Sequence, residues 1–190
     1  IAVCAQTGLP DEAIRASLAR FSGVKRRFQP TGSWNGVEIF DDYGHHPTEI
    51  EAVLKAARAG TRGRVIAVVE PHRYTRVRDL FSEFSRCLSD ADAVILTPLY
   101  SAGETPIEGV SSAALAEAVR RSGHASVTTV ASEKALASAV RRVARAGDIV
   151  ICFGAGNSTV CDECPRQRNV KTITRFTRIQ DVAPVDPDLC

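Results

Sequence analysis

The spacing of hydrophobic positions changes along this chain. Near the start, Ile14, Leu18 and Phe21 recur at the i, i+4, i+7 spacing of one helical face, which predicts a helix over residues 10–21. At the other end, apolar periodicity fades while charges and prolines accumulate. We therefore expect residues 159–190 to form a poorly ordered tail.

Between these ends, short and fully apolar segments alternate with amphipathic ones. The apolar segments predict strands at 37–40, 65–69, 93–96, 127–130 and 149–153. The amphipathic segments predict helices at 48–59 and 77–88, a helix capped by Ser111 or Ser112 that ends near Arg121, and a helix capped by Ser132. Strands that are apolar on both faces are typical of a parallel sheet covered by helices on both sides. The pattern predicts an open, doubly wound α/β sheet over about residues 29–157.

A stretch rich in turn residues precedes the first of these strands. Residues 29–35 read Gln-Pro-Thr-Gly-Ser-Trp-Asn, and Pro, Gly, Ser and Asn are the residues that turns favour. The flanking segments, 24–28 and 36–42, have the composition of strands. We expect two extended segments joined by a loop.

Composition places the chain among globular proteins. Of 190 residues, 44% are hydrophobic and 24% are charged, which is enough for a packed core. The 24 Lys and Arg against 22 Asp and Glu give a net charge of +2, which indicates neither a nucleic-acid nor an acidic-membrane partner. No apolar run approaches the roughly 20 residues of a membrane-spanning helix, and no secretory signal opens the chain. We expect a cytoplasmic protein.

The metal-binding residue types give no clear metal site. Cys161 and Cys164 form a lone C-x-x-C pair, whereas structural zinc sites normally add a second pair or histidines. Asp42, His45 and His46 offer an alternative set, but adjacent histidines point apart on a strand or helix. We therefore expect no metal ligands in this chain.

Unusual polar residues follow the carboxyl ends of the predicted strands, where open parallel sheets bind ligands. These stretches are Asp-Asp-Tyr-Gly-His-His at 41–46, Glu-Pro-His-Arg-Tyr-Thr-Arg at 70–76, Pro-Leu-Tyr-Ser-Ala-Gly-Glu at 98–104 and Gly-Ala-Gly-Asn at 154–157. Each stretch also has a plainer interpretation as a strand end, a helix cap, solvated charge or a tight turn. Their occurrence together on one predicted edge favours a binding site.

The residue types on this edge suit an anionic ligand. Arg73 and Arg76 lie three positions apart at an expected helix start, and two guanidinium groups can grip a carboxylate in bidentate fashion. The helix N-terminus adds amide donors, and a neutral histidine nearby can orient an amine or accept its proton. These residues predict a receptor for a free amino acid or a phosphate.

Five stretches of sequence resemble a known family. "FSGVKRRFQ", "DDYGHHPTEI", "PHRYTR", "LYSAGETPIEGVS" and "CFGAGN" stand in an order and spacing similar to those of the Mur ligase family of bacterial peptidoglycan synthesis. The resemblance covers about residues 10–158, and "PHRYTR" favours the alanine-adding members. It implies that residues 1–25 end the ATPase central domain. It also implies a Rossmann-like C-terminal domain at 26–158, followed by a non-family tail at 159–190.

The resemblance also implies a reaction and its participants. It implies the ATP-dependent addition of L-alanine to UDP-N-acetylmuramate through an acyl phosphate, with ATP and Mg²⁺ as cofactors. The alternatives are a related Mur-type peptide ligase and a non-catalytic module that binds an amino acid or nucleotide. The implied alanine-binding residues are Tyr43, His45, Arg73 and Arg76, and the implied ATP-binding residues are Arg27, at the phosphates, and Asp42, at the ribose.

Two features of the sequence depart from the family pattern. No G-x-x-x-x-G-K-[ST] phosphate loop occurs, so we expect ATP and Mg²⁺ to be held mainly by domains outside this chain. The chain also contains no methionine and begins at Ile1. We interpret it as the C-terminal fragment of a longer ligase, and we expect it to be inactive alone.

Overall fold

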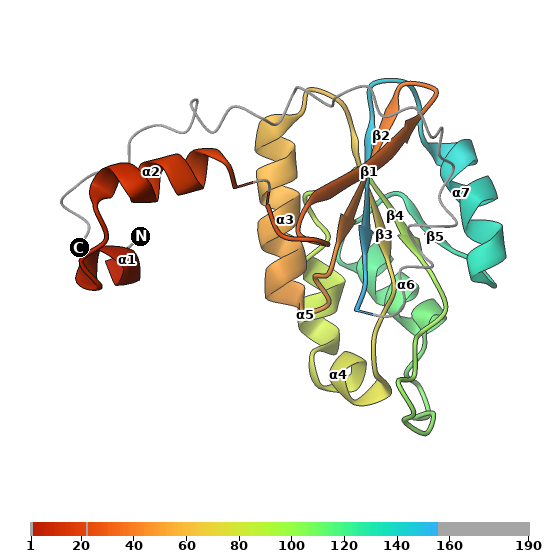
Figure 1. Cartoon of the computed structure of the whole chain (residues 1–190). Helices are drawn as coiled ribbons and strands as arrows, with labels where there is room; N and C mark the ends of the chain where they lie inside the picture. The colour runs from red at the N-terminus through yellow and green to blue at the C-terminus, as the bar shows by residue number, and fades with distance from the viewer. Residues whose placement is uncertain (1, 22, 156–190) are drawn as a thin grey trace.

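One mixed sheet forms the centre of the protein. The computed structural model describes residues 2–21 and 23–155. Within them, strands lie in the order β1-β2-β6-β3-β4-β5, with β1 antiparallel to β2 and the other pairs parallel (Figure 1). This arrangement confirms the predicted mostly parallel α/β sheet. The strands are β1 (Gln29–Trp34), β2 (Val37–Asp42), β3 (Val65–Val69), β4 (Ala93–Leu96), β5 (Val127–Thr129) and β6 (Ile149–Phe153).

Helices cover both faces of the sheet, as the apolar strands predict. Alternate strand residues point to opposite faces, so Val65, Ala67 and Val69 join one core cluster while Ile66 and Val68 join the other. The first cluster packs against α3 to α6, and the second against α7. The helices are α1 (Ala2–Gln6), α2 (Asp11–Ala19), α3 (Pro47–Gly60), α4 (Tyr74–Asp79), α5 (Phe81–Arg86), α6 (Ser112–Arg121) and α7 (Leu136–Val143), which follows the 3₁₀ helix η1 (Glu133–Ala135).

Side-chain caps fix where two of the helices begin. The His46 ring accepts a hydrogen bond from the Thr48 amide, while Glu49 accepts one from the His46 amide, which makes a capping box at the start of α3. Ser111 accepts from the Ala114 amide at the start of α6, so the predicted cap is confirmed. The α3 cap places the preceding residues 43–45 at the carboxyl end of β2.

The extended segments before the first parallel strand differ from the prediction. The stretch 29–34, expected as a loop, is β1, and it pairs with β2 in a hairpin. The turn is Asn35-Gly36, whose φ angles of 46° and 79° are both positive, as a two-residue hairpin turn requires. Residues 24–28, expected as a strand, instead cross the end of the sheet in turns and bends. A β-bulge at Pro30–Gly32 accommodates the turn-favouring residues within β1.

Two helical predictions also need correction. The single helix expected at 77–88 is α4 followed by α5, because the backbone leaves helical geometry at Leu80 (φ −114°, ψ 25°). α4 begins three residues earlier than expected, at Tyr74. α2 forms where the pattern predicts it, but none of its residues is buried, and it extends away from the sheet together with α1, a helix that the pattern did not predict.

Some predictions concern residues outside the described ranges. The tail at 159–190, Asn157 and the Cys161–Cys164 pair belong to this group. Within the described ranges, none of the helices combines the length and apolar character needed to cross a membrane.

Candidate functional site

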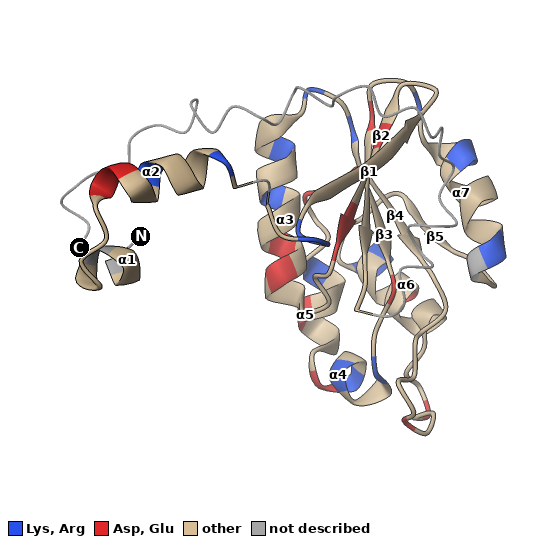
Figure 2. Ribbon diagram, viewed as in Figure 1, with Lys and Arg blue, Asp and Glu red and all other residues tan. Residues whose placement is uncertain are grey.

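The segments that follow β2, β3 and β6 emerge side by side at the carboxyl edge of the sheet. Phe153 of β6 pairs with Asp42 of β2 on one side and with Val69 of β3 on the other. β4 ends beside β3, where Leu96 pairs with Val69. In Figure 2 the acidic end of β2 and the basic turns of α4 lie on this side of the sheet. The predicted convergence of these stretches on one edge is therefore confirmed for the residues up to 155.

Four aromatic rings form a row across this edge. Tyr43 meets His45 edge-on at 5.2 Å between ring centroids, and His45 lies 5.8 Å from His72. His72 in turn stacks on Tyr100 at 5.2 Å. A parallel bridge between the backbones of His72 and Tyr100 holds the last two rings in place. The row therefore joins the segments after β2, β3 and β4 into one surface.

Arg76 reaches this row from the first turns of α4. Its Nη1 lies 3.2 Å from His72 Nδ1 and 3.5 Å from the His72 carbonyl oxygen. His72 is 9% exposed, and its burial, followed by the positive charge of Arg76, lowers the pKa of its imidazole. The arginine thus lies against a nearly buried ring within the row.

Arg73 lies at the N-cap of α4 in an unusual backbone conformation. Its φ is 69°, a left-handed value that is costly for a residue with a side chain, and its amide donates to the Tyr100 carbonyl at 2.8 Å. The Arg73 guanidinium is exposed and 3.9 Å from Glu104. Glu104 also accepts hydrogen bonds from the Thr75 amide and hydroxyl, which lower the pKa of its carboxyl. The Thr75 amide, in the first turn of α4, is therefore already occupied by Glu104.

Arg26 and Arg27 border the row at its other end. Arg26 donates to Asp41 at 3.1 Å and to the Gly154 carbonyl at 2.7 Å, and its guanidinium carbon lies 5.0 Å from the Tyr43 ring centroid. Arg27, the residue that the resemblance implies at the ATP phosphates, is half exposed, and its Nη1 lies 3.5 Å from Glu49 Oε1. Arg26 therefore holds the 24–28 segment against the ends of β2 and β6, while the Arg27 side chain lies beside Glu49 of α3.

Asp42 has a structural role at the base of the site. It is 1% exposed. Its Oδ2 accepts from the Phe28 amide and its Oδ1 from the Gly44 amide, both at 2.7 Å. These bonds fasten the 24–28 segment and the turn after β2 to the same strand end. A direct contact between Asp42 and a ribose does not fit this arrangement.

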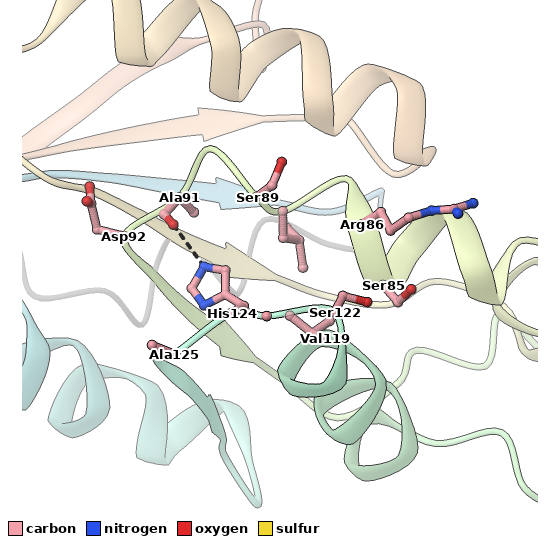
Figure 3. A pocket seen from close by; sticks show the side chains of 11 residues that line it. Ser85, Arg86, Ser89, Ala91, Asp92, Val119, Ser122, His124 and Ala125 are labelled. Carbon is pink, nitrogen blue, oxygen red and sulfur yellow. Dashed lines mark hydrogen bonds between the residues drawn. The ribbon is translucent and has the colours of Figure 1, made fainter.

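A separate cavity of 440 Å³ lies at the opposite edge of the sheet, between α5 and α6 (Figure 3). Its lining includes Asp92 and Ala125, which precede β4 and β5, so it opens at the amino ends of these strands. His124 in this cavity lies 2.8 Å from the Ala91 carbonyl through Nε2 and accepts from the Ser126 amide through Nδ1. Both of its ring nitrogens are engaged by the backbone, so we place the candidate site at the carboxyl edge instead.

Metal and thiol chemistry find little support in the described ranges. Among residues 2–21 and 23–155, no three His, Cys, Asp or Glu side chains lie together as a metal site would require. Cys87 and Cys152 are buried, and burial raises the pKa of the Cys87 thiol to about 12. A thiol with so high a pKa is a poor nucleophile near neutral pH.

The structure brings together most of the predicted site residues and adds others that the sequence reasoning did not assign. Tyr43, His45 and Arg76 lie along the row, Arg73 lies at the start of α4, and Asp42 lies beneath the surface. The unassigned residues are His72, Tyr100, Glu104 and Arg26. All four lie within or beside the stretches that the sequence singled out, but their roles depend on contacts between those stretches.

Comparisons with known proteins identify relatives for most of the chain. The family model described as "Mur ligase, glutamate ligase domain" matches residues 26–156. A UDP-N-acetylmuramate–L-alanine ligase of Chelativorans sp. (strain BNC1) is 57% identical over 159 residues, which are 84% of this chain and 34% of that protein. The enzyme of the same name from Rhodospirillum centenum (strain ATCC 51521 / SW) is 58% identical over 159 residues, or 84% of this chain and 33% of that protein.

A solved structure shows the same fold. The crystal structure of a UDP-N-acetylmuramate–alanine ligase from Thermotoga maritima matches with a TM-score of 0.69 and 21% identity, over 86% of this chain and 34% of that one. The present chain thus spans about a third of the length of the relatives it matches.

Proposed function

The chain belongs to the Mur ligase family, and we propose that it supplies the amino-acid site of an ATP-dependent ligase that adds L-alanine to UDP-N-acetylmuramate. The observation that carries the proposal is the row of Tyr43, His45 and His72 with Arg76 beside it. It offers an aromatic surface with a positive charge held beside it. The names of the relatives at 57–58% identity supply the two substrates.

In this proposal Arg73, at the N-cap of α4, and Arg76, within α4, hold the alanine carboxylate. Arg73 is exposed and only loosely paired, 3.9 Å from Glu104, so its charge remains available to a ligand. Arg76 directs its guanidinium to the same edge, 3.2 Å from His72. A charge-assisted hydrogen bond to a carboxylate contributes about 1.5–3 kcal/mol. For a ligand as small as alanine, such bonds dominate the binding free energy.

The amine of the amino acid would lie toward Tyr43 and His45. The His45 Nδ1 is 2.9 Å from the Tyr43 carbonyl and 3.9 Å from Glu49 Oε2, so the ring is held on the side of α3. A neutral imidazole can orient the attacking amine and accept the proton that the amine loses. The chain's part in amide formation is then to bind alanine, orient its amine and exclude water from it.

ATP would supply the phosphoryl group that activates the muramate carboxyl. Arg27 fits a role at the phosphates, because it is half exposed and its 3.5 Å contact with Glu49 can be exchanged for a phosphate. Asp42 contributes indirectly, by holding the 24–28 segment through Phe28. The described residues contain no carboxylate cluster that fits Mg²⁺.

A binding titration of the isotope-labelled 190-residue chain tests the amino-acid site. L-Alanine should shift the NMR signals of Tyr43, His45, Arg73 and Arg76, and leave those of His124 at the opposite edge unchanged. L-Alaninamide, which lacks the carboxylate, is the matched control and should bind far more weakly. Tighter binding of a peptide than of free alanine would favour a peptide ligase, and shifts around His124 instead would reject the site.

A chimera tests the reaction. The matching third of the Chelativorans relative is replaced by this chain, and phosphate release is measured with ATP, UDP-N-acetylmuramate and L-alanine. We expect L-alanine-dependent release by the chimera and none by the isolated chain, which has no phosphate loop of its own. A folded chimera that binds UDP-N-acetylmuramate but does not use L-alanine would reject the proposed function.

A further inference from the structure

Arg76 differs from the other arginines of the carboxyl edge in the charge of its partner. Arg26 pairs with Asp41, Arg27 with Glu49 and Arg73 with Glu104. Arg76 instead lies 3.2 Å from the Nδ1 of His72. A carboxylate partner neutralises an arginine and competes with an anionic substrate for it, whereas a neutral imidazole fixes the arginine and leaves its charge intact.

The geometry selects one form of the His72 ring. A guanidinium only donates hydrogen bonds, so the Nδ1 that faces Arg76 must be an unprotonated acceptor, and the ring proton of the neutral form lies on Nε2. The ring has little freedom to turn away, because it stacks on Tyr100 and is 9% exposed. His72 is therefore a rigid acceptor.

The charges around His72 favour this neutral form. Arg76 faces it from α4 and Arg73 from the N-cap of that helix. His45 faces it from the segment after β2, and Glu104 from the loop after β4. The two arginines outweigh the single carboxylate, and the pKa of the ring is lowered, first by burial and then by Arg76. A proton added at Nδ1 would also remove the lone pair on which Arg76 depends.

We propose that His72 is the positioning residue of Arg76: its neutral imidazole holds the guanidinium for the substrate carboxylate, and protonation of Nδ1 releases it. The proposal rests on the proposed function, since it assigns Arg76 to the carboxylate of the amino acid. It also predicts the direction in which carboxylate affinity changes with pH. Added positive charge alone would attract a carboxylate more strongly as pH falls, whereas release of Arg76 weakens carboxylate binding as pH falls.

Two substitutions separate positioning from packing. His72→Phe keeps a ring for Tyr100 but removes the acceptor, and L-alanine binding to the chain should weaken about tenfold, the scale of one lost charged hydrogen bond. His72→Asn restores an acceptor near the position of Nδ1, and affinity should return to within about threefold of the wild type. An unchanged affinity for His72→Phe, or equal losses for both variants, would overturn the proposal.

The His72 tautomer and the pH dependence of L-alanine affinity can be measured on the wild-type chain. Long-range nitrogen–proton NMR should show His72 as the Nε2–H tautomer, and the affinity for L-alanine should fall as pH decreases through the His72 titration. The same dependence should be absent from His72→Asn, which keeps His45. A rise in affinity as His72 protonates, or an Nδ1–H tautomer, would contradict the proposal.

The side-chain signals of Arg76 distinguish a failure of this proposal from a failure of the proposed function. If L-alanine does not bind the chain, the proposed function loses its support, but exchange of the Arg76 guanidinium protons should still accelerate as His72 protonates. If L-alanine binds and those protons do not respond to the His72 titration, the positioning role is wrong while the amino-acid site stands.

Discussion

The two edges of the sheet use charged residues in opposite ways. At the amino edge, Asp148 accepts from the Arg64 side chain at 2.6 Å and 3.3 Å and from the Arg145 amide at 2.8 Å. At the carboxyl edge, Arg27 and Arg73 lie 3.5 Å and 3.9 Å from their carboxylates and are exposed. The groups at the amino edge are hydrogen-bonded to one another, and we call this edge closed. The arginines at the carboxyl edge keep positive charge accessible to a ligand, and we call this edge open.

Backbone conformation strengthens this difference. Apart from Asn35, the described non-glycine residues with positive φ lie in segments at the carboxyl edge: Arg26, Phe28, Arg73 and Ala102. At the amino edge, the left-handed positions Gly36 and Gly147 are glycines, which adopt that conformation without a side-chain clash. Strain carried by side-chain-bearing residues is typical of functional sites. The contrast therefore supports a stabilising role for the amino edge and the proposed binding role for the carboxyl edge.

Removing Asp148, the fully hydrogen-bonded carboxylate at the amino edge, should have the largest effect on stability. Asp148→Ala should lower the free energy of unfolding by about 3 kcal/mol, because it leaves a partly buried arginine and backbone amides without their acceptor. The estimate is at the low end of the usual range because the Arg64 side chain is 37% exposed and water can solvate it. Urea unfolding measures the loss, and L-alanine binding at the far edge should be unchanged.

The control for this prediction is an exposed ion pair. Asp79→Ala removes the partner of Arg78, and both side chains are more than half exposed. Exposed pairs contribute little to stability, so this variant should unfold at the wild-type urea concentration. Equal losses for Asp148→Ala and Asp79→Ala would remove the distinction between closed and open edges.

Removing a guanidinium from the open edge should affect binding instead. In the chimera, Arg76→Ala should raise the KM for L-alanine by about 10- to 150-fold, equivalent to about 1.5–3 kcal/mol, and leave the constants for ATP and UDP-N-acetylmuramate unchanged. The matched control is Arg78→Ala, because Arg78 lies on the same helix but pairs with Asp79. An equal loss for all three substrates would refute a carboxylate-binding role for Arg76.

The sequence predicts the buried parts of this protein well because burial imposes periodicity. The limits of β3, β4 and β6 match the prediction residue for residue, since strands covered on both faces read as unbroken apolar runs. The hairpin was misassigned because the edge strand β1 has no such run and contains Pro30 and Gly32. The Asn35-Gly36 pair was the better signal, since two-residue hairpin turns favour it.

The sequence predicts which edge of the sheet carries these residues more accurately than it predicts which side chains contact one another there. Strand ends fix which stretches meet, so Tyr43, His45, Arg73 and Arg76 could be assigned to one edge. The partner of each side chain depends on distances across three segments, and no local pattern encodes the 3.2 Å contact between Arg76 and His72. The burial of Asp42 could likewise not be predicted from the local sequence, because Asp42 accepts its hydrogen bond from Phe28 only where the 24–28 segment folds back over the strand end.

A glycine at the amino edge tests the contribution of backbone conformation. Gly36→Ala should lower the free energy of unfolding by about 1–2 kcal/mol, since a side chain disfavours its left-handed conformation. The φ angle is 79°, and an added Cβ would lie 3.2 Å from the Cβ of Ala146. Gly103→Ala is the matched control, because its φ is 84° but no atom lies within 4 Å of the added carbon. Thermal unfolding should show the smaller loss for Gly103→Ala, and the reverse order would show that packing at the hairpin turn does not matter.

The smallest expected effect is a pH dependence of stability from His72. Its pKa is lower in the folded protein than the ordinary value of 6.5, so the unfolded chain binds a proton more readily. The stabilisation is complete above pH 6.5 and is lost as pH falls through the lower, folded pKa. Glu49 and Glu104 also have lowered pKa values, but they act below their ordinary 4.5, in a separate range. Urea unfolding of the wild type should therefore show stability rising with pH just below 6.5, and His72→Asn should lose that rise. A stability that falls with pH in this range would mean that the folded protein holds His72 charged, and the open edge would then have a cation where we place a neutral acceptor.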